Sequence, residues 1–278
     1  MEQYIDLHVH SNASDGTLSP TEVVKLAKES GLSAIALTDH DTVSGIEEAM
    51  DAGKMYGVEV IPGIELSAEY KNGDLHILGL GIDYTDKDFI SKVSVCRDSR
   101  DNRNKKMIKK LNEQGFQVTW DMMLERFGAN SITRAHFAKY LIDEGYVENK
   151  DEAFKKYLNP GCPCYVSREK ISPKDAIEAI LKAGGHPVLA HPMLYKMNLE
   201  RIESVIVMLK GYGLQGIEAI YSLNRPEDDA ALLKIAKRQG MYITGGSDFH
   251  GSIKPDISIG TGKGNLRITK ETCALLFK

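Results

Sequence analysis

The sequence has few cysteines, no long apolar run and no segment of biased composition. Its four cysteines, Cys96, Cys162, Cys164 and Cys273, are too few and too unevenly spaced for a disulfide framework in a chain of 278 residues. No apolar stretch is long enough to span a bilayer, and the opening MEQYIDLHVH lacks the basic start and apolar run of a secretory signal. We therefore expect reduced thiols, a cytoplasmic location and no membrane contact.

The chain also lacks an excess of one charge. It carries 35 basic and 39 acidic residues, a formal net charge of −4, which argues against coating of nucleic acid by the whole surface and leaves a local basic site open. With 42% hydrophobic and 27% charged residues, the composition excludes a disordered or fibrous protein. The Cys-Pro-Cys at 162–164 has no second Cys or His pair at zinc-ribbon spacing, so we interpret it as a partly buried loop.

Short apolar runs alternate with amphipathic ones over most of the chain. Seven runs are predicted as strands, at 4–9, 33–41, 58–69, 74–83, 187–192, 216–222 and 241–251. Helical patterns lie between them, the first opened by a capping box at 19–22 with proline at the first helical position. This alternation predicts an α/β fold, a parallel (β/α) barrel one strand short of the usual eight.

The alternation stops between residues 86 and 165. Four helical patterns follow one another there without a strand, at 86–114, 121–127, 134–145 and 151–158. We expect residues 1–85 and 166–278 to form the barrel and residues 86–165 to form an inserted helical cap subdomain, with the turn at 159–161 as its exit.

Nine metal-capable side chains gather at the predicted strands. They are His8, His10, Asp15, His40, Glu65, His76, His191, Asp248 and His250. All but His76 lie at or just beyond the carboxyl end of a strand, the face of a parallel barrel where loops carry chemistry. One such histidine is more often structural, but nine packed together without a cation would leave unpaired acceptors and charges in a confined site.

The types of these side chains restrict the metal. Histidine nitrogen with carboxylate oxygen and no thiolate suits Mn, Fe or Zn. Nine candidates are too many for one tetrahedral ion, so we expect two or three divalent ions, with Glu65 as the bridging carboxylate.

Six short motifs resemble those of the polymerase and histidinol phosphatase (PHP) family. They are DLHVHS at 6–11, DG at 15–16, TDHD at 38–41, PGIE at 62–65, HP at 191–192 and GSDFH at 246–250. The TRAH at 133–136 resembles the stand-alone branch of that family, which acts on nucleoside 3′,5′-bisphosphates and on short RNA from the 5′ end. The resemblance implies a distorted seven-stranded (β/α) barrel and a metal-dependent phosphoesterase.

The resemblance also implies how the nine ligands divide among three ions. The first ion would be held by His8, His10, Glu65 and Asp248, the second by Glu65, His76 and His191, and the third by Asp15, His40 and His250. Some relatives have histidine where Asp15 stands. A carboxylate there favours a harder ion such as Mn²⁺ or Fe²⁺.

Such a centre would hydrolyse phosphate esters through a hydroxide that bridges two ions and attacks in line. His191, His250 or a metal-bound water would protonate the leaving oxygen. By the same resemblance, Arg134 and His136 would bind the substrate phosphate. The segment 97–110 holds seven basic and two acidic residues and could steer anions, with Arg97, Arg100 and Asn102 as further candidates.

Three alternatives remain at this point. A phosphatase for a small metabolite such as histidinol phosphate is one, although the basic insertion favours a nucleotide or short-RNA substrate. A non-catalytic, metal-stabilised module is another, but every ligand position is filled. A metal-dependent amidohydrolase usually bridges its ions with a modified lysine, and no lysine stands at a mid-barrel strand end here. We expect no stable protein partner.

Overall fold

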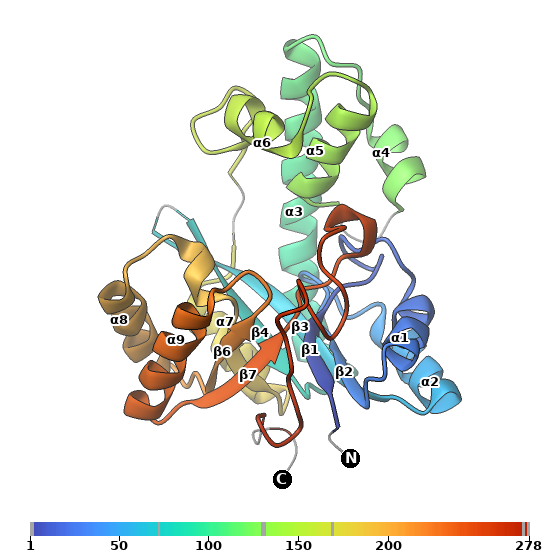
Figure 1. The fold of residues 1–278 in the computed structure, drawn as a ribbon. Helices are drawn as coiled ribbons and strands as arrows, with labels where there is room; N and C mark the ends of the chain where they lie inside the picture. Colours follow the sequence, from blue (N-terminus) through green and yellow to red (C-terminus); the bar gives the residue numbers. More distant parts are fainter. Residues whose placement is uncertain (1–2, 72, 129–131, 168–169, 274–275, 277–278) are drawn as a thin grey trace.

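The chain folds into a barrel that carries a separate group of helices above one rim (Figure 1). The computed structural model describes residues 3–71, 73–128, 132–167, 170–273 and 276. All seven predicted strands are present, in one sheet whose order follows the chain. They are β1 (Ile5–Val9), β2 (Ala34–Leu37), β3 (Glu59–Tyr70), β4 (Gly73–Leu80), β5 (His186–Leu189), β6 (Gly216–Tyr221) and β7 (Tyr242–Gly246).

Helices surround the barrel and build the cap. The barrel is flanked by α1 (Pro20–Glu29), α2 (Ile46–Tyr56), α7 (Pro173–Lys182), α8 (Leu199–Lys210) and α9 (Pro226–Gln239), with 3-10 turns η2 (Pro192–Tyr195) and η3 (Gly251–Ile253). The cap contains α3 (Lys87–Glu113), α4 (Trp120–Phe127), α5 (Arg134–Asp143), α6 (Lys150–Ala153) and the π-helix η1 (Phe154–Leu158). The predicted capping box of α1 is confirmed, because Ser19 and Glu22 each accept from the other's backbone N–H.

One strand runs against the others. β4 pairs antiparallel with both β3 and β5, whereas the other neighbouring pairs are parallel. A tight turn can join only antiparallel strands, so the β3–β4 hairpin reverses the chain. The distorted seven-stranded barrel with a helical insertion is therefore confirmed, but the expectation that all strands are parallel is wrong at β4. As a result, β4 begins at the rim where the parallel strands end.

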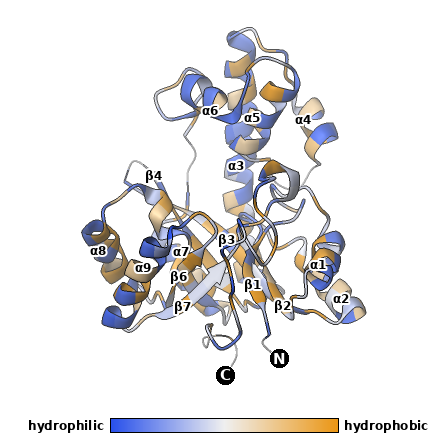
Figure 2. Cartoon of the chain, viewed as in Figure 1, coloured by the Kyte–Doolittle hydropathy of each residue, from blue (hydrophilic) through white to orange (hydrophobic). Residues whose placement is uncertain are grey.

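The alternation of side chains along the buried strands directs polar groups into the barrel. Ile64 and Leu66 of β3 belong to the apolar layer that packs against the outer helices. Because neighbouring side chains of a strand point to opposite faces, Glu65 between them points inward. His76 points inward for the same reason, since its two neighbours in β4 lie in that outer layer. Figure 2 shows hydrophobic residues concentrated in the strands and hydrophilic ones along the cap.

β1 departs from simple alternation. Ile5 and Leu7 lie in the core inside the barrel, whereas Val9 lies in the core under α1 and α2. The pairing of β1 with β2 shifts in register between Asp6 and Val9, where the alternation of inward and outward side chains also changes. Such an irregularity changes the direction of the side chains that follow it, and here His8 and His10 face the barrel interior.

The seam between β1 and β7 is held by a buried carboxylate. Asp6 accepts hydrogen bonds from the amide of Ser247 (2.8 Å), from its hydroxyl (2.5 Å) and from the amide of Gly260 (2.8 Å). Burial raises the pKa of Asp6, although these bonds favour its ionised form. The strands approach so closely that a Cβ on Gly246 would lie 2.4 Å from the Cβ of His8.

The cap has its own hydrophobic core, and α3 joins it to the barrel. Phe89 and Val93, near the start of α3, pack into the barrel's outer core, whereas Met107 and Leu111, near its end, pack among the cap helices. We propose the division into a barrel of residues 1–85 and 166–278 and a cap of residues 86–165, with the first turns of α3 anchored in the barrel.

Cys164 is a free thiol buried in the cap core. None of the described helices is both long and apolar enough to cross a membrane.

The seam predicts unequal effects for two glycine-to-alanine changes. Gly246→Ala should lower the free energy of unfolding by about 3 kcal/mol, because the new methyl group meets the backbone of His8. Gly73→Ala should change it by less than about 0.5 kcal/mol, because no described residue apart from its chain neighbours lies within 4 Å of the position that its methyl group would take. Urea denaturation measures both, and equal stabilities would contradict the tight seam.

Candidate metal centre

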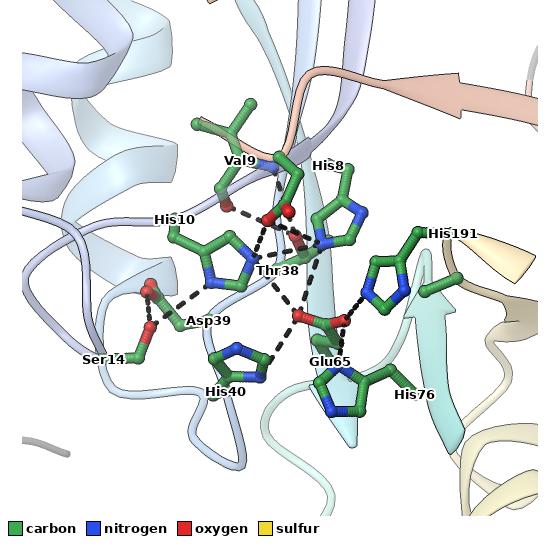
Figure 3. A network of polar contacts seen from close by, with 12 residues as sticks. His8, Val9, His10, Ser14, Thr38, Asp39, His40, Glu65, His76 and His191 are labelled. Atoms are coloured by element: carbon green, nitrogen blue, oxygen red, sulfur yellow. Dashed lines mark hydrogen bonds and ion pairs between the residues drawn. The ribbon is translucent and has the colours of Figure 1, made fainter. Parts of the chain in front are cut away.

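The structure brings all nine predicted side chains to one rim of the barrel. β1 supplies His8, β3 supplies Glu65, and β4 supplies His76; the other six follow the ends of β1, β2, β5 and β7. The exception noted in the sequence, His76, reaches the same rim because β4 runs in the opposite direction. Figure 3 shows the histidines pointing toward the carboxylate of Glu65. The described residues form four overlapping groups able to hold a metal ion.

Two histidines and two carboxylates form the first group. The Nε2 atoms of His8 and His10 lie 3.1 Å apart, and each lies 3.2 to 3.6 Å from Oε2 of Glu65 and from Oδ1 of Asp248. Four ligands held about 2.1 Å from one ion in a tetrahedron would lie roughly 3.4 Å apart. The spacing is therefore that of ligands around one shared ion.

Glu65 also faces a second group of histidines. Its Oε1 lies 2.7 Å from Nδ1 of His76 and 3.0 Å from Nε2 of His191. Its Oε2 is buried without a hydrogen bond, although Nδ1 of His40 is 3.1 Å away and is itself unpartnered. Buried polar atoms normally have partners, so these unpartnered atoms fit a cation that the side chains would share.

A third group is formed by His10, Asp15, His40 and His250. Oδ1 of Asp15 lies 3.2 Å from Nε2 of His250, and its Oδ2 lies 3.9 Å from Nε2 of His40. Nδ1 of His250 donates to the backbone carbonyl of Asp248 at 2.9 Å. That bond places the proton on Nδ1 and leaves the Nε2 lone pair directed at Asp15.

Burial and charge set the protonation of these groups. Burial lowers the pKa of His40 to about 3, so its imidazole is neutral at physiological pH. Burial also disfavours charge on His10, but the carboxylates of Asp248 and Glu65 outweigh it and raise the pKa of His10 to about 9. Burial opposes ionisation of Glu65 too, yet the surrounding histidines hold the pKa of Glu65 well below its usual range. The cluster therefore contains ionised carboxylates that attract cations.

Three outer contacts were missed by the sequence analysis. The hydroxyl of Tyr221 and the ammonium of Lys254 each donate to Oδ2 of Asp248 at 2.6 Å, which leaves Oδ1 for the cluster. Glu218 lies behind His8, with its Oε1 2.9 Å from Nδ1. The sequence does contain a signal for Glu218, because a carboxylate between apolar residues in GIEAIY repeats the pattern of Glu65 in PGIELS.

The backbone is strained where strands end at the site. Asp41, His191 and Asp248 adopt φ values of +53°, +30° and +57°, which side-chain-bearing residues rarely take. Such conformations persist only where surrounding contacts hold them, and they concentrate at functional sites.

A cavity of about 190 Å³ lies between this rim and the cap. Its cationic lining residues are Arg100, Arg103, Arg134 and Lys170, and it also contacts Asp15, His40 and His76. Carboxylates pair with two of the cations, the buried Asp41 with Arg100 and the partly buried Asp74 with Lys170. Arg134 forms no ion pair with a described residue; it donates weakly to the carbonyl of Leu158 at 3.5 Å. Arg103 was not among the predicted candidates.

The other candidates lie elsewhere. His136 caps the start of α5 by accepting from the amide of Thr133 at 3.0 Å, and it lines a separate cavity under α4. Arg97 is exposed on α3, and Asn102 lines a neighbouring groove. The structure therefore does not place these three residues in the cavity that Arg134 lines, and their substrate roles stay predictions.

The comparisons with known proteins agree with this geometry. The PHP domain model matches residues 6–160. A 5′-3′ exoribonuclease of Haemophilus influenzae is 37% identical over 250 residues, 90% of this chain and 91% of the relative. A 3′,5′-nucleoside bisphosphate phosphatase of Chromobacterium violaceum is 38% identical over 248 residues, 88% of this chain and 87% of the relative.

A solved structure supports the same assignment. The structure comes from Bifidobacterium adolescentis, and its description names a metal-dependent phosphoesterase. It superposes with a TM-score of 0.85 and 31% identity, covering 97% of this chain and 94% of that one. The six motifs, the barrel and the two curated relatives agree, and the chain belongs to the PHP family.

Proposed function

We propose that this protein is a metal-dependent phosphoesterase that hydrolyses phosphate esters of nucleotides. The observation that carries the proposal is the cavity in which four cationic side chains face the rim of the histidine and carboxylate cluster. Cationic side chains bind phosphate, and the adjacent cluster could hold the ions that activate it for hydrolysis. The names of the two curated relatives support a nucleotide or RNA ester as the substrate.

The proposed ion sites follow the three groups of ligands. We assign His8, His10, Glu65 and Asp248 to the first ion, Glu65, His76 and His191 to the second, and Asp15, His40 and His250 to the third. Mn, Fe and Zn all suit nitrogen and oxygen donors. When bound, such ions would neutralise charge on the phosphoryl group and make water more acidic.

The chain's own residues would bind and orient the ester. The guanidinium of Arg134 faces the cavity from the start of α5 and can bind two phosphate oxygens at once. Arg100 contributes less free charge, because Asp41 already neutralises it. Arg134 is thus the residue best placed to hold a phosphate group against the rim.

The group that protonates the leaving oxygen stays a prediction. Nε2 of His191 faces Glu65, and Nε2 of His250 faces Asp15, an orientation that suits both rings as ligands. His40 cannot supply a proton at neutral pH, since its pKa is about 3. The cytoplasmic location and the absence of a stable protein partner also stay predictions.

An activity assay tests the proposed function. Purified protein should contain divalent metal, and with added Mn²⁺ it should release phosphate from adenosine 3′,5′-bisphosphate and nucleotides from short 5′-phosphorylated RNA. Histidinol phosphate is the matched small-metabolite substrate, and Asp248→Asn is the variant expected to lose both metal and activity. Hydrolysis of histidinol phosphate alone would replace the nucleotide proposal, and no hydrolysis of any substrate would contradict a phosphoesterase.

A second prediction separates substrate binding from metal binding. Arg134→Ala should raise KM about 10- to 100-fold, the effect of losing charge-assisted hydrogen bonds to phosphate, and should leave the metal content unchanged. Lys174→Ala on the outer face of α7 removes an exposed cation and should leave KM unchanged. Steady-state kinetics and metal analysis measure both variants. Metal loss in Arg134→Ala, or an unchanged KM, would contradict this role.

A further inference from the structure

β6 is the strand that supplies none of the nine proposed ligands, yet it places a carboxylate directly behind two of them. Glu218 is fully buried, and its neighbours Ile217 and Ala219 pack in the outer core, so its side chain points into the barrel. One oxygen contacts the side chain of His8, and the other accepts from the backbone of His191. Glu218 thus contacts one ligand of the proposed first ion and one ligand of the proposed second ion.

The first contact determines which nitrogen of His8 is available. Oε1 of Glu218 lies 2.9 Å from Nδ1 of His8. A carboxylate accepts hydrogen bonds, so the contact is a hydrogen bond when Nδ1 of His8 carries the proton. Nε2 is then the ring nitrogen that could supply a lone pair to an ion, and it points at His10, Glu65 and Asp248.

The second contact holds the strained residue that follows β5. The amide of His191 donates to Oε2 of Glu218 at 2.7 Å, and His191 has a φ of +30°. Nε2 of the same residue faces Glu65 at 3.0 Å. A shift of this backbone would move the imidazole away from the proposed second ion.

We propose that Glu218 is a positioning residue, which tightens metal binding by fixing the Nδ1-protonated form of His8 and by holding the backbone of His191. The inference rests on the proposed metal site. Carboxylates that orient metal-binding histidines in this way typically change metal affinity 10- to 100-fold.

Replacing Glu218 with glutamine tests the hydrogen bonds of this side chain without changing its size. Glu218→Gln keeps the size of the side chain, but its amide has one accepting oxygen and one donating NH₂ group. If the oxygen accepts from the amide of His191, the NH₂ group faces Nδ1 of His8 and favours protonation at Nε2. If the oxygen accepts from His8, the NH₂ group faces the His191 amide, and two donors oppose each other. One of the two contacts is lost in either orientation.

The test measures Zn²⁺ affinity by competition with a chromogenic chelator, in the full chain stripped of metal. Glu218→Gln should bind Zn²⁺ 10- to 100-fold more weakly than the wild type. The matched control is Thr244→Val, because Thr244 pairs with Glu218 in the sheet, is buried and has a hydroxyl that makes no hydrogen bond to a described residue. Its Zn²⁺ affinity should stay within about threefold of the wild type. Equal weakening in the two variants would overturn the proposal.

A measurement on the wild type does not depend on how the variants fold. Long-range ¹H–¹⁵N spectra of the Zn²⁺-loaded protein should show His8 with a proton on Nδ1 and without one on Nε2. A proton on Nε2 instead would overturn the proposal even if Glu218→Gln bound metal weakly. Failure of the wild type to bind any divalent metal would contradict the proposed function itself, which distinguishes the two failures.

Discussion

Five imidazole rings converge on the buried carboxylate of Glu65, and the rest of the site depends on this convergence. His8, His10 and His40 approach one oxygen, and His76 and His191 approach the other, all within 3.3 Å. Without cations, such a cluster would bury lone pairs and charges that face one another away from water. The barrel must therefore hold five strands in register at one rim, and the reversed β4, the phase change in β1 and the strained strand ends all contribute to this.

Local properties of the sequence predicted the strands and the nine side chains of the cluster. The alternation of apolar and polar residues, and the position of a residue at the end of a strand, can both be recognised within a single segment. His8, His40 and Glu65 were therefore identified as candidate metal ligands. The division of ligands among ions came from the resemblance to a family rather than from spacing. Contacts between distant segments could not be predicted in this way. Glu218 contacts His8 and His191 from another strand, and Arg103 lines the cavity because α3 places it beside the rim.

The cap is joined to the barrel by α3, which has two hydrophobic anchors. α3 has 27 residues, with its start in the barrel's outer core and its end in the core of the cap. At its middle, Arg100 pairs with Asp41, whose neighbour His40 belongs to the cluster. The cavity that Arg134 lines is thus bounded by two separately packed units. Recognition of the substrate would depend on the cap, and activation of the phosphate would depend on the barrel.

Anomalous diffraction from crystals grown with Mn²⁺ tests the central claim most directly. The account predicts at least two anomalous peaks at this rim, one of them within about 2.0–2.3 Å of Nε2 of His8 and His10 and of the carboxylates of Glu65 and Asp248. It also predicts that Glu65 contacts two ions. Ordered side chains with no peak among them, or ions bound only elsewhere on the chain, would contradict it.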